Sequence, residues 1–169
     1  MFKRILVPVD GGPVSMLGLR QAIKLSALEG ARLRLVHVVD EMPIMVDAEM
    51  GIMPDTIPAL REGAKKVLAH AAAVAKRSGI TAEISMVESM GGSTADFIVS
   101  EAKKWRADVI VLGTHGRSGL ERVFMGSSAE DIIRSTPVPV LLVRAKDEEE
   151  IAAERPAARR KAPSRPSAH

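Results

Sequence analysis

The chain alternates between two hydrophobic patterns, and this alternation limits its possible folds more than any other feature. Five short segments are apolar enough to form buried or half-buried strands, and the segments between them repeat apolar residues at helical spacing. The predicted strands cover residues 3–9, 32–39, 82–86, 109–112 and 136–143, and the predicted helices cover about 16–29, 56–78, 93–105 and 127–133. A helix between successive strands makes every connection a crossover, so we expect an α/β fold with a parallel sheet.

The polarity of the individual strands predicts their order. Segments 3–9 and 109–112 are the most uniformly apolar and should be central, whereas segment 82–86 alternates with polar residues and segment 136–143 contains Pro139, which cannot donate to a ladder. Short right-handed crossovers then favour a single open sheet in the order 3-2-1-4-5, with helices on both faces. In such sheets the ligand crevice lies at the carboxyl ends of the strands, where the winding direction reverses.

Capping signals and helical spacing predict where the helices begin and which faces they bury. Gly30 is a stop signal, and Ser93 and Ser127 each stand three residues before an acidic residue, as in a capping box. Leu60 is predicted to belong to the buried stripe of helix 56–78, and Ile133 to the buried face of the last helix.

Two loops should meet at the predicted crevice. One contains Asp10, and the other runs from Gly113 through Gly116, Arg117 and Gly126 to Ser127. Glycines let backbone N–H groups converge and a helix N-terminus adds partial positive charge, so the second loop has the composition of an anion cradle. Asp10, on the opposite lip, could accept hydrogen bonds from ribose hydroxyls or help to hold a divalent cation such as Mg²⁺.

Each of these residues also has a structural explanation when it is considered alone. The glycines could simply permit turns, Ser127 with Glu130 could only cap a helix, and His115 could be an exposed loop residue. The sequence contains no P-loop, no dinucleotide fingerprint, no serine nucleophile elbow and no metal-ligand spacing of His or Glu. The pattern therefore indicates a phosphate-binding device without evident catalytic groups.

Composition excludes several other classes of function. The chain has no cysteine, which rules out disulfides and thiolate chemistry, and its 2% aromatic content argues against base-stacking platforms for specific nucleic-acid binding. The apolar run near the N-terminus is too short for a signal peptide or a membrane span. We therefore expect a cytoplasmic protein without a membrane partner.

Two segments fall outside the alternating pattern. Residues 40–58 contain three prolines and four of the nine methionines, and either a binding loop or an ordinary surface loop would fit them. Residues 146–169 form a basic tail rich in Pro, Ala and Arg that is predicted to be disordered. The expected folded domain is thus residues 1–145.

The chain resembles the universal stress protein (UspA-like) family over roughly residues 1–145. The most specific similarity is the family's ATP-binding pattern G-x2-G-x9-G-[ST], which Gly113, Gly116, Gly126 and Ser127 match. The resemblance implies an adenine nucleotide alpha hydrolase-like fold that binds ATP. The implied contacts are Val9 and the Val38 backbone with adenine, Asp10 with ribose, and Gly116, Arg117, Gly126, Ser127 and Ser128 with the phosphates.

The resemblance also implies a homodimer formed through the last strand. The residues concerned would be Val138, Val140, Leu141, Leu142 and Val143. An apolar edge strand without a neighbour would independently need such cover. Gly12 departs from the family, since many relatives carry serine there.

Three functions are consistent with these features. The leading hypothesis is a stress-response regulator whose bound ATP changes the surfaces used for dimerisation or for an unknown protein partner. The second is a slow Mg²⁺-dependent ATPase or nucleotidyl-transfer enzyme, which lacks an obvious general base. The third is a nucleotide-independent interaction module that acts through residues 40–58 and the tail.

Overall fold

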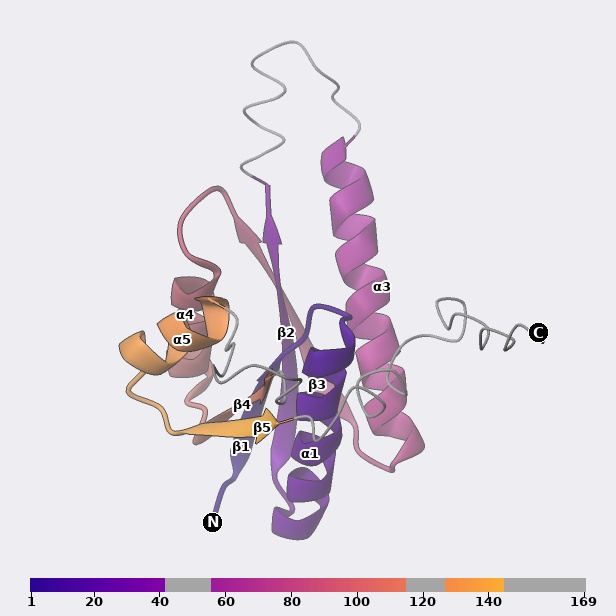
Figure 1. Ribbon diagram of the computed structural model, residues 1–169. Helices are drawn as coiled ribbons and strands as arrows, with labels where there is room; N and C mark the ends of the chain where they lie inside the picture. The colour runs from indigo at the N-terminus through magenta and orange to yellow at the C-terminus, as the bar shows by residue number, and fades with distance from the viewer. Residues whose placement is uncertain (42–55, 115–126, 145–169) are drawn as a thin grey trace, which may run out of the picture.

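The computed structural model describes residues 1–41, 56–114 and 127–144 and shows a parallel five-stranded sheet in the predicted order β3-β2-β1-β4-β5 (Figure 1). The predicted loop 40–58 and the predicted tail lie largely or wholly outside the described residues. The strands are β1 (Arg4–Pro8), β2 (Arg32–Asp40), β3 (Ala82–Ser89), β4 (Val109–Thr114) and β5 (Val140–Arg144). The helices are α1 (Pro13–Glu29), α3 (Thr56–Arg77), α4 (Thr94–Trp105) and α5 (Ser127–Ser135).

The helices cover the two faces of the sheet in pairs: α1 and α3 lie on one face, and α4 and α5 lie on the other (Figure 1). Alternate residues of each strand therefore enter one of two apolar cores. In β1, Ile5 and Val7 pack on the α1/α3 side and Leu6 packs on the α4/α5 side, all with no exposed surface. Burial on both faces explains why β1 and β4 read as continuous apolar runs.

The two outer strands differ from the sequence prediction in detail. On β3, Ile84 is 59% exposed although Ala82 and Met86, which share its face of the strand, pack against the core, so the helix cover of this face is incomplete at the sheet edge. β5 begins at Val140 rather than at residue 136. Pro139 precedes the strand and contributes only its carbonyl, which accepts a hydrogen bond from the Ile110 N–H at 2.9 Å.

The helix ends agree with the predicted caps except at α5. Gly30 ends α1 in the left-handed conformation, and the Ser93 side chain accepts from the Ala95 N–H at 3.2 Å at the start of α4. Ser127 is the first residue of α5 rather than the residue before it, so the capping position falls on residue 126, outside the described residues. The prediction that Ser127 caps this helix is therefore wrong by one position, because the serine already belongs to the first turn.

Two apolar side chains predicted to be buried are partly exposed. Leu60 is 38% exposed in the first turns of α3, and Ile133 is 36% exposed on α5 next to the buried Ile132. Both helices present to the sheet a stripe narrower than the run of apolar residues in the sequence. None of the helices in the part of the chain that the structure describes has the length and apolar character needed to cross a membrane.

Candidate functional site

A cavity of about 350 Å³ opens at the carboxyl ends of β1, β2 and β4, where residues from the N-terminal parts of α1, α4 and α5 complete its lining. It lies at the point where the strand order reverses between β1 and β4, which is where a doubly wound sheet holds its ligand. Its described lining residues are Pro8, Val9, Asp10, Val14, Ser15, Val36, His37, Val38, Thr94, Ile98, Leu112, Gly113, Thr114, Ser127, Ser128, Ala129 and Ile132.

The cavity has an apolar interior and a polar rim. The apolar lining residues come from the ends of the strands and from α1, α4 and α5, and they include Val9, Val36, Val38, Ile98, Leu112 and Ile132. The rim carries five hydroxyl groups, from Ser15, Thr94, Thr114, Ser127 and Ser128, and the carboxylate of Asp10. Such a cavity suits a ligand with one flat apolar end and one polar end.

Asp10 follows β1 directly and is held by its own loop. Its Oδ1 atom accepts a hydrogen bond from the Gly12 N–H at 2.7 Å and another from the Ser15 hydroxyl at 2.6 Å. Gly12 is the N-cap of α1 and has no side chain to cap the helix, so the Asp10 carboxylate supplies the negative charge at this helix N-terminus. The carboxylate is exposed at the rim of the cavity.

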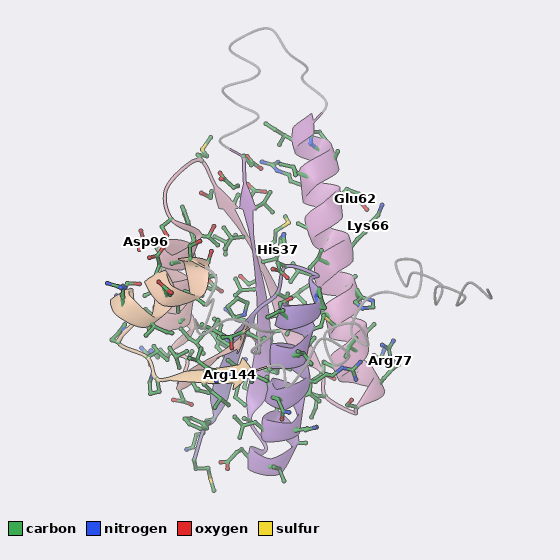
Figure 2. The ribbon with its side chains drawn as sticks, viewed as in Figure 1. His37, Glu62, Lys66, Arg77, Asp96 and Arg144 are labelled. Carbon is green, nitrogen blue, oxygen red and sulfur yellow. The ribbon has the colours of Figure 1, made fainter. Side chains whose placement is uncertain are left out.

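His37, on the neighbouring strand, makes a hydrogen bond to the backbone at the end of β1. It lies on β2 near the middle of the molecule, on the α1/α3 face that Leu33 and Leu35 also share (Figure 2). Its Nδ1 atom lies 2.6 Å from the Val9 carbonyl oxygen. Since a carbonyl only accepts, Nδ1 carries the proton in this contact and fixes the backbone immediately before Asp10.

Gly113 is required by backbone packing. A Cβ at this position would lie 1.8 Å from the carbonyl oxygen of Val14, and a Cβ at Gly18 would lie 2.8 Å from the Gly113 nitrogen. Helix α1 and strand β4 therefore touch through their backbones, with no side chain between them. The first glycine of the phosphate-binding pattern thus has a structural role in this chain whether or not a ligand binds.

The opposite rim is formed by the first turn of α5 and the end of β4. Ser127 and Ser128 are exposed at the start of α5, where its free N–H groups and positive dipole end lie. Thr114 is only 4% exposed and lines the cavity. This side of the cavity therefore offers hydroxyl groups and a helix N-terminus suited to an anion.

Six predicted site residues line this one cavity: Val9, Asp10, Val38, Gly113, Ser127 and Ser128. The other three, Gly116, Arg117 and Gly126, lie outside the described residues. No group of three or more His, Asp or Glu side chains that could hold a metal ion occurs among residues 1–41, 56–114 and 127–144. Asp10 is the only carboxylate among the described lining residues of the cavity, and the roles of all nine residues stay predictions.

Four polar residues of the cavity were not predicted from the sequence. Ser15 and Thr94 occupy first turns of helices, and their position after the predicted loops was a signal that could have identified them. Thr114 directly follows Gly113, inside the recognised pattern. His37 stands between apolar residues near the end of β2, and this isolated polar side chain could also have been noticed in the sequence.

Comparison with known proteins agrees with this architecture. Residues 1–144 match the universal stress protein family. The chain belongs to that family. Universal stress protein MJ0531 of Methanocaldococcus jannaschii is 33% identical over 144 residues, which span 85% of this chain and 83% of the relative. This universal stress protein is therefore similar to a curated relative over most of both chains.

Solved structures show the same fold. The protein MJ0577 of Methanocaldococcus jannaschii has a TM-score of 0.70 at 27% identity, and the match covers 87% of this chain and 99% of that one. A universal stress protein from Archaeoglobus fulgidus in complex with dAMP has a TM-score of 0.59 at 23% identity, with 83% of this chain and 96% of that one covered. These two structures show that this universal stress protein shares its fold with both proteins.

Proposed function

We propose that this universal stress protein binds ATP in the cavity at the carboxyl ends of its sheet. The observation that carries the proposal is the pairing, within one cavity of about 350 Å³, of an apolar interior with a rim that bears an oriented carboxylate and five hydroxyls. An adenine ring needs the apolar interior, and a ribose with its phosphates needs the polar rim. The dAMP complex of the Archaeoglobus protein supports the choice of an adenine nucleotide.

The proposed contacts follow the chemistry of each wall. Adenine would lie against Val9 and the backbone of Val38, and the ribose would lie beside Asp10. The phosphates would meet Ser127 and Ser128 at the N-terminus of α5. In the matched pattern, Gly116, Arg117 and Gly126 would complete the phosphate contacts.

Mg²⁺ would accompany the phosphates as their counter-ion. Asp10 Oδ2 makes no hydrogen bond to a described residue, so it is the carboxylate oxygen through which this chain could approach the ion. Mg²⁺ commonly uses one or two carboxylates, phosphate oxygens and water, and one free carboxylate oxygen fits that requirement. The ion would supply positive charge that the described lining residues do not carry.

We further propose that ATP acts as a regulatory ligand in the cytoplasm rather than as the substrate of an enzyme. The edge strand β5 gives such a ligand a surface to modulate, because Leu141 and Leu142 are 40% and 41% exposed on it. Pairing of β5 with a second copy, through Val138, Val140, Leu141, Leu142 and Val143, would cover this apolar edge. Sedimentation should then show a homodimer that Leu141→Lys dissociates, and a concentration-independent monomer would contradict this part of the proposal.

Bound nucleotide in the purified protein provides the test of the main proposal. The protein is purified without added nucleotide, denatured with acid, and the supernatant is separated by ion-pair chromatography. We expect an adenine nucleotide at a substantial fraction of the protein concentration. The absence of released nucleotide, together with no binding when ATP is added back, would favour the nucleotide-independent interaction module.

A further inference from the structure

The two oxygens of the Asp10 carboxylate are not equivalent. Oδ1 accepts from the Gly12 N–H at 2.7 Å and from the Ser15 hydroxyl at 2.6 Å, so two donors occupy it. Oδ2 has no hydrogen-bond partner among the described residues. One oxygen is therefore committed to the loop, and the other is available at the rim of the cavity.

The Ser15 hydroxyl closes a small hydrogen-bonded ring around this carboxylate. Its oxygen lies 2.6 Å from Asp10 Oδ1, 3.0 Å from the Gly12 carbonyl oxygen and 3.3 Å from the Asp10 backbone nitrogen. A hydroxyl has one proton, and the charged acceptor at the shortest distance takes it. The Asp10 N–H can then donate to the serine oxygen, so that Ser15 holds both the backbone and the carboxylate of Asp10.

The position of this ring points to a ligand. Both Asp10 and Ser15 line the cavity. Thr114, which lines the same cavity, is 4% exposed. Asp10, Ser15 and Thr114 therefore offer polar groups to a ligand within one cavity.

We infer that Ser15 is a positioning residue: it occupies Asp10 Oδ1 and thereby leaves Oδ2 to accept a hydrogen bond from a sugar hydroxyl of the bound nucleotide. This inference rests on the proposed function and adds the class of ligand that the site prefers, a ribonucleotide rather than a nucleotide without ribose hydroxyls. Ser15 acts through Asp10 and is not proposed to touch the ligand.

The first arm of the test needs no ligand. The variant Ser15→Ala removes the hydroxyl, Ser15→Thr restores one, and Gln21→Ala, an exposed position on the same helix, is the matched control. If Ser15 positions Asp10, the Gly12 amide should exchange with solvent faster, by about tenfold, and shift its resonance in Ser15→Ala. Ser15→Thr and Gln21→Ala should keep the wild-type values. An unchanged Gly12 amide in Ser15→Ala would overturn the inference.

The second arm compares ATP with 2′,3′-dideoxy-ATP by calorimetry in the presence of EDTA, so that no Mg²⁺ can approach Asp10 Oδ2. Only ATP has the hydroxyls that Oδ2 could accept from, so Ser15→Ala should weaken ATP by about five- to tenfold and leave the dideoxy analogue unchanged. An equal loss for both ligands would mean that Ser15 merely stabilises the loop and would overturn the selective role. Wild-type protein that binds neither ligand would refute the proposed function and, with it, the ribose preference, while the Gly12 amide would still decide whether Ser15 positions Asp10.

Discussion

The loops on the two sides of the cavity are held in place by different means. The loop after β1 is held by hydrogen bonds that converge on one carboxylate, with the Gly12 N–H and the Ser15 hydroxyl both directed at Asp10 Oδ1. The end of β4 is held by close backbone packing, because Gly113 lies against the Val14 carbonyl with no room for a side chain. The two sides should therefore respond differently to substitution: the β4 side in folding, and the β1 side mainly in binding.

Because of this difference, a glycine of the family's ATP-binding pattern cannot be interpreted in this chain as a ligand contact alone. A loss of ATP binding in a Gly113 variant would not demonstrate a phosphate contact, since the same substitution disturbs the packing of α1 on β4. Asp10 and Ser15 are better positions for testing the ligand, because their side chains lie at the rim and outside the two apolar cores.

The largest expected effect is on the β4 side. Gly113→Ala places a methyl group 1.8 Å from the Val14 carbonyl oxygen, so α1 must shift and the free energy of unfolding should fall by more than about 3 kcal/mol. Urea denaturation measures this change. The control is Gly63→Ala in α3, where nothing lies within 4 Å of the new Cβ and stability should rise by up to about 1 kcal/mol. A Gly113→Ala protein as stable as wild type would refute the packing argument.

The next effect is on binding at the β1 side. Asp10→Asn keeps an oxygen that can accept from the Gly12 N–H. It removes the negative charge of the carboxylate, whose oxygen would accept a hydrogen bond from a ribose hydroxyl or coordinate Mg²⁺. We expect ATP to bind about tenfold more weakly while the unfolding midpoint changes little, since the carboxylate is exposed. Calorimetry and urea denaturation on the same sample test this separation. Equal damage to stability and to binding would remove the distinction between the two sides.

His37 provides a smaller test of how the β1 side is held. His37→Phe keeps a ring of similar size but removes the Nδ1 donor, leaving the Val9 carbonyl without this partner. The free energy of unfolding should decrease by about 1–2 kcal/mol, and ATP affinity should decrease slightly because Asp10 follows directly. The control is His70→Phe at an exposed position on α3, and the free energy of unfolding should fall less in this variant. An equal decrease in the two variants would mean that the contact between His37 and Val9 does not contribute to stability.

The smallest effect is expected away from both loops. Hydrogen bonding to Arg34, and then to Arg32, lowers the pKa of Glu83 below its usual 4.5, against the opposing effect of partial burial. A depressed pKa in the folded state gives stability that is present above pH 4.5 and is lost as the pH falls through the folded-state pKa. Glu83→Gln should therefore flatten the acid limb of the stability curve and leave ATP binding at neutral pH unchanged. A changed affinity would show that the edge near β3 is coupled to the cavity.

Much of the fold could be predicted because local patterns and topology agree. The burial of β1 on both faces appears in the sequence as a continuous apolar run, and the proline before β5 marked an edge correctly. The start of β5 was predicted four residues too early, because apolar residues around Pro137 and Pro139 resemble a strand until the missing N–H donors are considered.

The site was predictable only in part. Sequence spacing identified Asp10, Gly113, Ser127 and Ser128, which the fold brings to one cavity. It could not show that Gly113 is packed against Val14, because that contact joins elements about a hundred positions apart. Nor could it assign Ser15, whose hydroxyl becomes significant only once its distance to the Asp10 carboxylate is known.

Titration of nucleotide-free protein with ATP tests directly whether the cavity binds the nucleotide. The protein is stripped of any copurified nucleotide, its fold is verified by circular dichroism, and ATP is added in the calorimeter with Mg²⁺ present. We expect saturable binding with about one ATP per chain, because this cavity would hold one nucleotide, and a clear weakening in Asp10→Asn. A folded protein that gives no saturable signal, or that binds ATP equally well in Asp10→Asn, would contradict this prediction.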